Sequence, residues 1–82
     1  MYDYKSILNK LTDEQIDWFR YQVRILGNYI RQNNSPMTNY IEAQINGFCK
    51  GLVYCGVITK DEAGKLGNEL HLLGICGEEL EV

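Results

Sequence analysis

The chain has 82 residues, which is enough for one domain and too few for a second hydrophobic core. Eight basic and eleven acidic residues give a net charge of −3, and 45% of the residues are apolar. This balance excludes a strongly cationic nucleic-acid coat and a highly charged disordered segment. We find no run of about 18 apolar residues to span a membrane, and the first residues do not resemble a secretory signal.

Two helices are predicted in the first part of the chain. Residues 2–10 are expected to form a short amphipathic helix, because four apolar side chains recur at helical spacing. These side chains are Tyr4, Ile7, Leu8 and Leu11. A longer helix is predicted over residues 13–33, after Thr12, whose hydroxyl can form a reciprocal capping box with Gln15. Asparagines suited to a left-handed cap, followed by Pro36, end this helix.

The third predicted helix begins with Ser35 as its N-cap and Pro36 in its first turn. Gly47 and Gly51 lie four residues apart on one of its faces. Because a glycine inside a helix costs about 1 kcal/mol relative to alanine, we expect this face to pack closely against another helix. Gly56 is predicted to end the helix in a left-handed conformation.

The fourth predicted helix follows a second capping box, between Thr59 and Glu62, and ends at Gly74. Residues 75–82 are expected to form a short acidic tail, with Ile75 as its candidate buried residue. The seams of the three long helices predict the core. Its members are Phe19, Val23, Leu26, Ile30, Ile41, Ile45, Phe48, Leu52, Ile58, Leu66, Leu70 and Leu73.

Together these elements predict an all-α fold, a single domain over residues 1–82. The domain is a compact bundle of three main helices plus a short N-terminal helix. One segment is ambiguous, because the short apolar run over residues 51–58 also fits a buried strand. No second strand is predicted to pair with it, which favours the helix.

Motifs for metal binding and catalysis are weak. Cys49, Cys55 and Cys76 are odd in number and contain no CxxC pair, which predicts reduced, buried or half-buried thiols in a cytoplasmic protein. Residues 51–62 match only the back half of an EF-hand loop. His71 is the one candidate base near neutral pH, and we expect it to be exposed or half-packed. We therefore predict no metal, no cofactor, no small-molecule substrate and no enzymatic activity.

Basic residues gather in the middle of the chain. Residues 18–55 carry four basic residues and one acidic residue, whereas residues 56–82 carry two basic and six acidic residues. Most of the positive charge recurs along one stripe of the second helix, which we call the arginine stripe. The arginine stripe consists of Arg20, Arg24 and Arg31.

The candidate partner-binding residues are the arginine stripe and Tyr21. Arginine and tyrosine are enriched in protein interfaces. Helical spacing places Arg20, Tyr21 and Arg24 outside the core seam, so they are available to bind a protein partner or a second copy of the chain. The acidic tail is a further counter-surface, in cis or from a neighbouring molecule. The alternative is a solvated face balanced by Asp17 and that tail.

Nucleic-acid association through the arginine stripe is the second functional hypothesis. The turn before Thr59 is similar to that of a helix-turn-helix motif, in which the second helix presents its N-terminal residues to DNA. Here those residues include Asp61 and Glu62, whose carboxylates would repel phosphate. We therefore expect a protein partner or self-association rather than a nucleic acid.

The stretch Phe48-Cys-Lys-Gly-Leu-Val-Tyr-Cys-Gly-Val-Ile-Thr-Lys-Asp-Glu-Ala63 resembles one that recurs in small uncharacterised proteins of Gram-positive phages, plasmids and conjugative elements. In those proteins an apolar helix ends in a glycine, and an acidic capping box begins a leucine-rich helix. No activity is carried over with the resemblance. Some of those proteins are inhibitors or accessory factors that act by binding another protein, which implies a protein partner for this chain.

Overall fold

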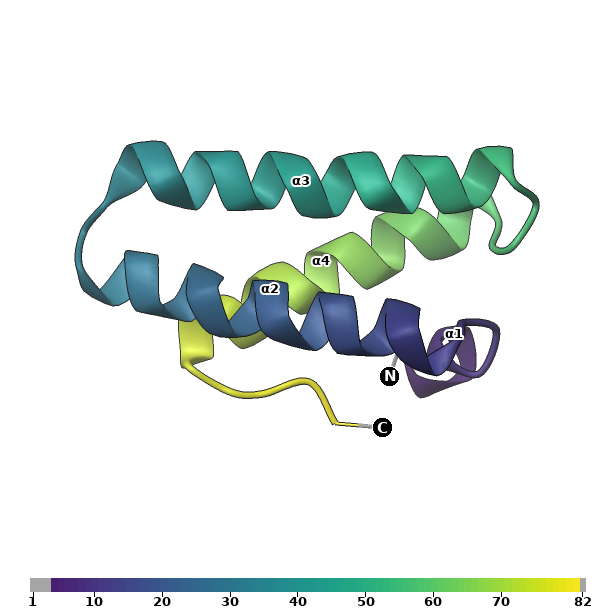
Figure 1. The fold of residues 1–82 in the computed structure, drawn as a ribbon, viewed down its shortest axis with the longest axis horizontal. Coiled ribbons are helices and arrows are strands. Elements are labelled where there is room, and N and C mark those ends of the chain that lie inside the picture. The colour runs from purple at the N-terminus through teal and green to yellow at the C-terminus, as the bar shows by residue number, and fades with distance from the viewer. Residues whose placement is uncertain (1–3, 82) are drawn as a thin grey trace.

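The computed structural model describes residues 4–81, which form four helices (Figure 1). Helix α1 covers Lys5–Leu8, α2 covers Asp13–Arg31, α3 covers Ser35–Tyr54 and α4 covers Lys60–Cys76. Helices α2 and α3 run antiparallel, and α4 crosses behind them, so that each long helix packs against the other two. Residues 4–81 contain no strand, which confirms the all-α bundle of three main helices plus a short N-terminal helix.

Local hydrogen bonds explain where the long helices begin. At α2, the Gln15 backbone N–H donates to Thr12 Oγ1 at 3.1 Å, and the Thr12 N–H donates to Gln15 Oε1 at 2.9 Å. The equivalent box between Thr59 and Glu62 begins α4, so both predicted capping boxes are confirmed. The N-cap of α3 is Asn34 rather than Ser35, because the Asn34 side chain accepts the backbone N–H at the third helical position.

The helix ends agree with the predictions in two of three cases. Asn33 after α2 and Gly56 after α3 both have positive φ, as expected for left-handed caps. Helix α4 does not end at Gly74 as predicted but continues to Cys76, with Gly77 as its left-handed cap. The short α1 begins at Lys5, and residues 2 and 3 of its predicted range lie outside the described residues.

The core is one cluster shared by all four helices. Nine of the predicted core residues are buried, whereas Ile30, Phe48 and Leu73 are only partly buried at its edge. The core also contains Ile7, Leu8 and Leu11, so α1 and its connection cover one end of the bundle. A stack of aromatic rings joins α2 to α3: the centroids of Trp18 and Phe48 are 4.4 Å apart and their planes are inclined by 20°.

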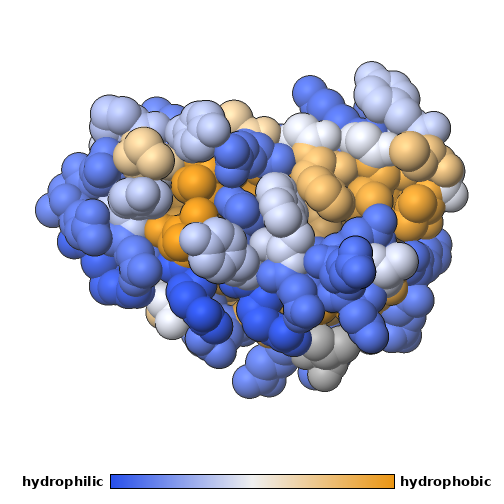
Figure 2. Space-filling view, in the orientation of Figure 1, coloured by the Kyte–Doolittle hydropathy of each residue, from blue (hydrophilic) through white to orange (hydrophobic). Residues whose placement is uncertain are grey.

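The predicted packing of the Gly47 and Gly51 face is wrong. Both glycines are exposed, and nothing would lie within 4 Å of a Cβ at either position. The glycine spacing suggested close contact, but α4 packs on another face of α3. Figure 2 shows instead that apolar atoms reach the surface between α2 and the C-terminal end of α3, and that polar atoms cover the lower edge of this view.

The end of the chain folds back onto the bundle. After α4 the chain runs beneath α2 in an extended conformation and returns toward α1 (Figure 1). Ile75, the predicted buried residue of this region, is 52% exposed, because α4 continues through it and turns its side chain outward. The buried residue is Leu80, which is 2% exposed and belongs to the core. We refer to residues 77–81 as the C-terminal segment.

Candidate functional site

The arginine stripe lies along the C-terminal segment. Arg20 Nε donates to the Leu80 backbone oxygen at 3.3 Å, and Arg24 Nη2 lies 3.3 Å from Glu79 Oε1. The residue earlier in α2 thus meets the later residue of the segment, as an antiparallel arrangement requires. The acidic counter-surface is therefore found in cis for Arg24.

The third arginine of the stripe lies at the beginning of the segment. Arg31 Nη1 would lie 3.2 Å from a Cβ on Gly77, so the guanidinium is in contact with this turn. Its Nη2 also donates to Asn28 Oδ1 in the preceding turn of α2. All three arginines of the stripe therefore line one extended peptide segment, which sequence spacing alone did not predict.

Leu80 is the apolar anchor of the segment. The neighbouring Glu78, Glu79 and Glu81 are all exposed. The segment therefore buries one apolar side chain and leaves its acidic groups in solvent. Sequence reasoning missed Leu80. The signal was present, since Leu80 is the single leucine within an acidic run, but one apolar residue has no periodicity to reveal its partner.

The far end of the segment reaches the beginning of α1. Burial raises the pKa of Tyr4 above its ordinary value of 10.0, and the negative charges of Glu69 and Glu81 raise it further. A shallow hollow of about 360 Å³ lies here, lined by Tyr4, Leu73 and the three glutamates of the segment. The C-terminal segment thus contacts α2 and Tyr4, the N-cap of α1.

Part of the candidate surface remains free. The side chain of Arg24 is 56% exposed despite its ion pair, and Tyr21 is 57% exposed. The side chain of Arg20 is more enclosed, at 34% exposed, and forms an ion pair with Asp17 within α2, at 2.9 Å. Tyr21 and the outer side of Arg24 are consequently open to solvent, whereas Arg20 is committed to contacts within the chain.

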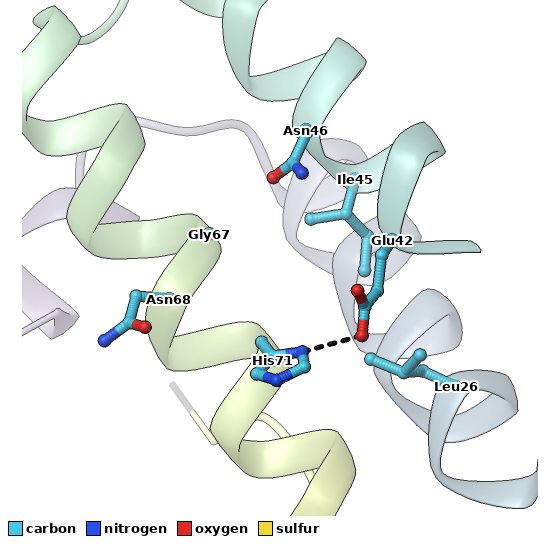
Figure 3. Close-up of a pocket in the computed structure, with 7 residues that line it drawn as sticks. All are labelled: Leu26, Glu42, Ile45, Asn46, Gly67, Asn68 and His71. Carbon is cyan, nitrogen blue, oxygen red and sulfur yellow. Dashed lines mark ion pairs between the residues drawn. The ribbon is translucent and has the colours of Figure 1, made fainter. Parts of the chain in front are cut away.

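A second candidate lies between α3 and α4, where His71 and Glu42 point toward each other across a hollow (Figure 3). His71 Nδ1 lies 2.7 Å from Glu42 Oε1, and both side chains are partly exposed. The hollow measures about 260 Å³ and its lining includes no Ser, Thr, Cys or Lys. The pair therefore joins two helices and has no nucleophile beside it. His71 is half-buried, as predicted.

The three cysteines differ from one another. Cys49 is buried, and burial raises the pKa of its thiol to about 11. Cys55 and Cys76 are exposed, which corrects the expectation that all three would be at least half-buried. Among residues 4–81, no three His, Cys, Asp or Glu side chains are grouped so that they could hold a metal ion.

No helix in the described part of the chain has both the length and the apolar character needed to cross a membrane. Comparisons of the chain with family models, curated proteins and solved structures find no match.

Proposed function

We propose that this chain is a small, non-enzymatic protein-interaction module. Its binding surface is the arginine stripe together with Tyr21. The observation that supports this most directly is that Tyr21 and the outer side of Arg24 are exposed side by side, although neither side chain is needed for the core. An exposed aromatic ring beside a guanidinium is the combination that protein interfaces favour.

The alternative, a nucleic-acid accessory protein, is less well supported. The arginines lie among the carboxylates of Asp17 and Glu79, and two further glutamates of the C-terminal segment are exposed nearby. Phosphate groups that approach the stripe would meet these negative charges. An enzyme is also less well supported, because the His71–Glu42 pair lacks a neighbouring nucleophile.

The proposal includes a cytoplasmic location and an origin in a mobile genetic element. Free cysteine thiols, two of them exposed, are typical of a reducing compartment. The resemblance over residues 48–63 is the sole support for the mobile-element origin.

Tyr21→Ala provides the test of the proposed function, because the Tyr21 hydroxyl makes no hydrogen bond with the residues that the structure describes. Sedimentation velocity measures self-association, and quantitative affinity capture from the source cells measures binding of other proteins. We expect Tyr21→Ala to weaken whichever association the unmodified chain shows. Tyr40→Ala is the matched control, since Tyr40 on α3 is 55% exposed and lies outside the proposed surface.

A second variant reverses charge without loss of the ion pair. Arg24→Glu combined with Glu79→Arg retains an opposite-charge pair at this position and inverts its outward sign. We expect this swap also to reduce association. Retention of every association in both Tyr21→Ala and the charge swap contradicts the proposal. Binding to DNA that weakens steeply with added salt supports the nucleic-acid alternative instead.

A further inference from the structure

The C-terminal segment is held in the manner of a bound peptide. Its backbone is extended, one side chain is buried, and its charged side chains remain at the rim. Arg20 Nε binds a backbone oxygen of the segment, and Arg24 binds a side chain. Apolar side chains held in a pocket or groove, with polar and charged groups at the rim, are a recurrent way in which short segments bind proteins.

The C-terminal segment can dissociate from the bundle without unfolding a helix. Gly77, with φ +70°, ends α4 before the segment begins. The backbone hydrogen bonds of this region join the N–H groups of Gly77 and Glu78 to α4 carbonyl oxygens. From Glu79 to Glu81, the described contacts are side-chain contacts, one arginine bond to a carbonyl oxygen, and a hydrogen bond between the Glu81 backbone and the Tyr4 side chain. Release after Glu78 therefore leaves these hydrogen bonds and those within α4 intact.

Release of the C-terminal segment would expose the apolar site that Leu80 occupies, which we call the seat of Leu80. The apolar site vacated by Leu80 belongs to the core cluster, and the guanidinium groups of Arg20 and Arg24 lie beside it. Such a site fits an extended acidic segment with one leucine. The order of residues in such a segment matters, because Arg24 pairs with Glu79, the acidic residue that directly precedes the leucine.

We propose that the seat of Leu80 is a peptide-binding site for an acidic, leucine-containing segment of a partner protein. The chain's own residues 77–81 occupy this site as an intramolecular competitor. This inference rests on the proposed function and adds the chemistry of the partner and a means of regulation. A partner segment binds at the site only in the fraction of molecules whose own segment is released.

The test uses a fluorescent hexapeptide with the sequence of residues 77–82 and the full chain. Fluorescence anisotropy compares its affinity for the unmodified chain and for Leu80→Ala. We expect Leu80→Ala to bind the peptide at least about tenfold more tightly, because its own segment no longer fills the seat. A peptide in which alanine replaces the leucine should not bind either chain. Backbone NMR spectra establish that each variant is folded.

Glu79→Arg provides a second test that keeps the leucine. Arginine at this position repels Arg24 and loosens the segment, so the hexapeptide should again bind more tightly than to the unmodified chain. Adding Arg24→Glu to Leu80→Ala should weaken peptide binding, whereas adding Lys50→Glu, an equal charge change on α3, should not.

Equal peptide affinity for the unmodified chain, Leu80→Ala and Glu79→Arg would overturn the inference, as would an absence of binding to all three. Failure here is distinguishable from failure of the proposed function. If the peptide does not bind but Tyr21→Ala still weakens association, the surface binds a partner by another route. If the peptide binds but Tyr21→Ala changes no association, the seat serves the chain's own segment alone.

Discussion

Leu26 packs directly over Gly74 where α2 crosses α4. A Cβ on Gly74 would lie 2.6 Å from Leu26 Cδ2 and 2.9 Å from Leu26 Cγ. On the other helix, a Cβ on Gly27 would lie 3.3 Å from the Gly74 backbone oxygen. Gly27 and Gly74 are both buried, so this crossing depends on the absence of side chains at these positions.

Gly74→Ala is therefore expected to destabilise the fold. The added methyl displaces the buried Leu26, and overpacking of this kind costs about 1–3 kcal/mol, which exceeds the gain in helix propensity. Gly51→Ala is the contrast, because open space surrounds Gly51, and it should stabilise by about 0.5–1 kcal/mol. Urea denaturation of both variants measures the difference. A stabilising Gly74→Ala would show that α2 and α4 do not approach so closely.

Leu80→Ala tests whether the C-terminal segment is docked. Loss of one buried leucine from the core should lower the free energy of unfolding by about 1–3 kcal/mol. Ile75→Ala, in the last turn of α4, removes an exposed side chain and should change stability by less than about 0.5 kcal/mol. Thermal denaturation of the two variants gives the comparison. Equal melting temperatures would mean that the segment is not held against the bundle.

Phe19 and Phe48 differ in burial and should differ in energetic effect. Phe19 is fully buried, so Phe19→Ala should cost about 3–5 kcal/mol. Phe48 is half-buried but stacks on Trp18, so Phe48→Ala should cost less, about 2 kcal/mol. Both losses of stability are measured from the denaturation midpoints, provided that the unfolding free energy depends equally on denaturant concentration in each variant. The reverse order would contradict the placement of Phe48 at the edge of the core.

Glu62 predicts a loss of stability in acid. The hydrogen bond from Lys10 at 2.7 Å, followed by the Thr59 backbone N–H, holds the pKa of Glu62 below its ordinary value of 4.5. Because the pKa is lower in the folded state, this stabilisation is complete above the ordinary pKa. It is lost as the pH falls through the folded pKa.

Glu62→Gln should therefore flatten the dependence of stability on pH at the acid end, as measured by denaturation between about pH 2 and 7. Lys10→Gln removes the same ion pair from the other side. Near neutral pH, the double variant should lose less free energy of unfolding than the sum of the losses in the two single variants. Strict additivity would show that the two side chains do not interact in solution.

Cys49 should resist alkylation in the folded protein. Its thiol is buried, and a pKa of about 11 keeps it protonated near pH 8. Cys55 and Cys76 are exposed and should react with iodoacetamide under these conditions. Mass spectrometry after labelling counts the modified sites, and labelling in urea should modify all three. Reaction of Cys49 at the rate of the exposed thiols would contradict its burial.

The local features of this protein follow from residues that are close together in the sequence. The capping boxes at Thr12 and Thr59 and the left-handed residues Asn33 and Gly56 were predicted correctly, because each depends on residues within one helical turn. The core seams were largely correct for a similar reason. Helical periodicity identifies an apolar stripe, and an amphipathic helix buries that stripe.

Which helix faces meet depends on contacts between segments that are distant in the sequence. Gly47 and Gly51 have the spacing of a close helix contact, yet Gly27 and Gly74 lie at the close contact between α2 and α4, because the crossing of these helices selects the face. Leu80 and Arg20 are 60 residues apart, and no local pattern links them. Their pairing depends on the direction in which the chain leaves α4 at Gly77. That direction is determined by packing between distant segments, whose free energy is not encoded within any single turn of the chain.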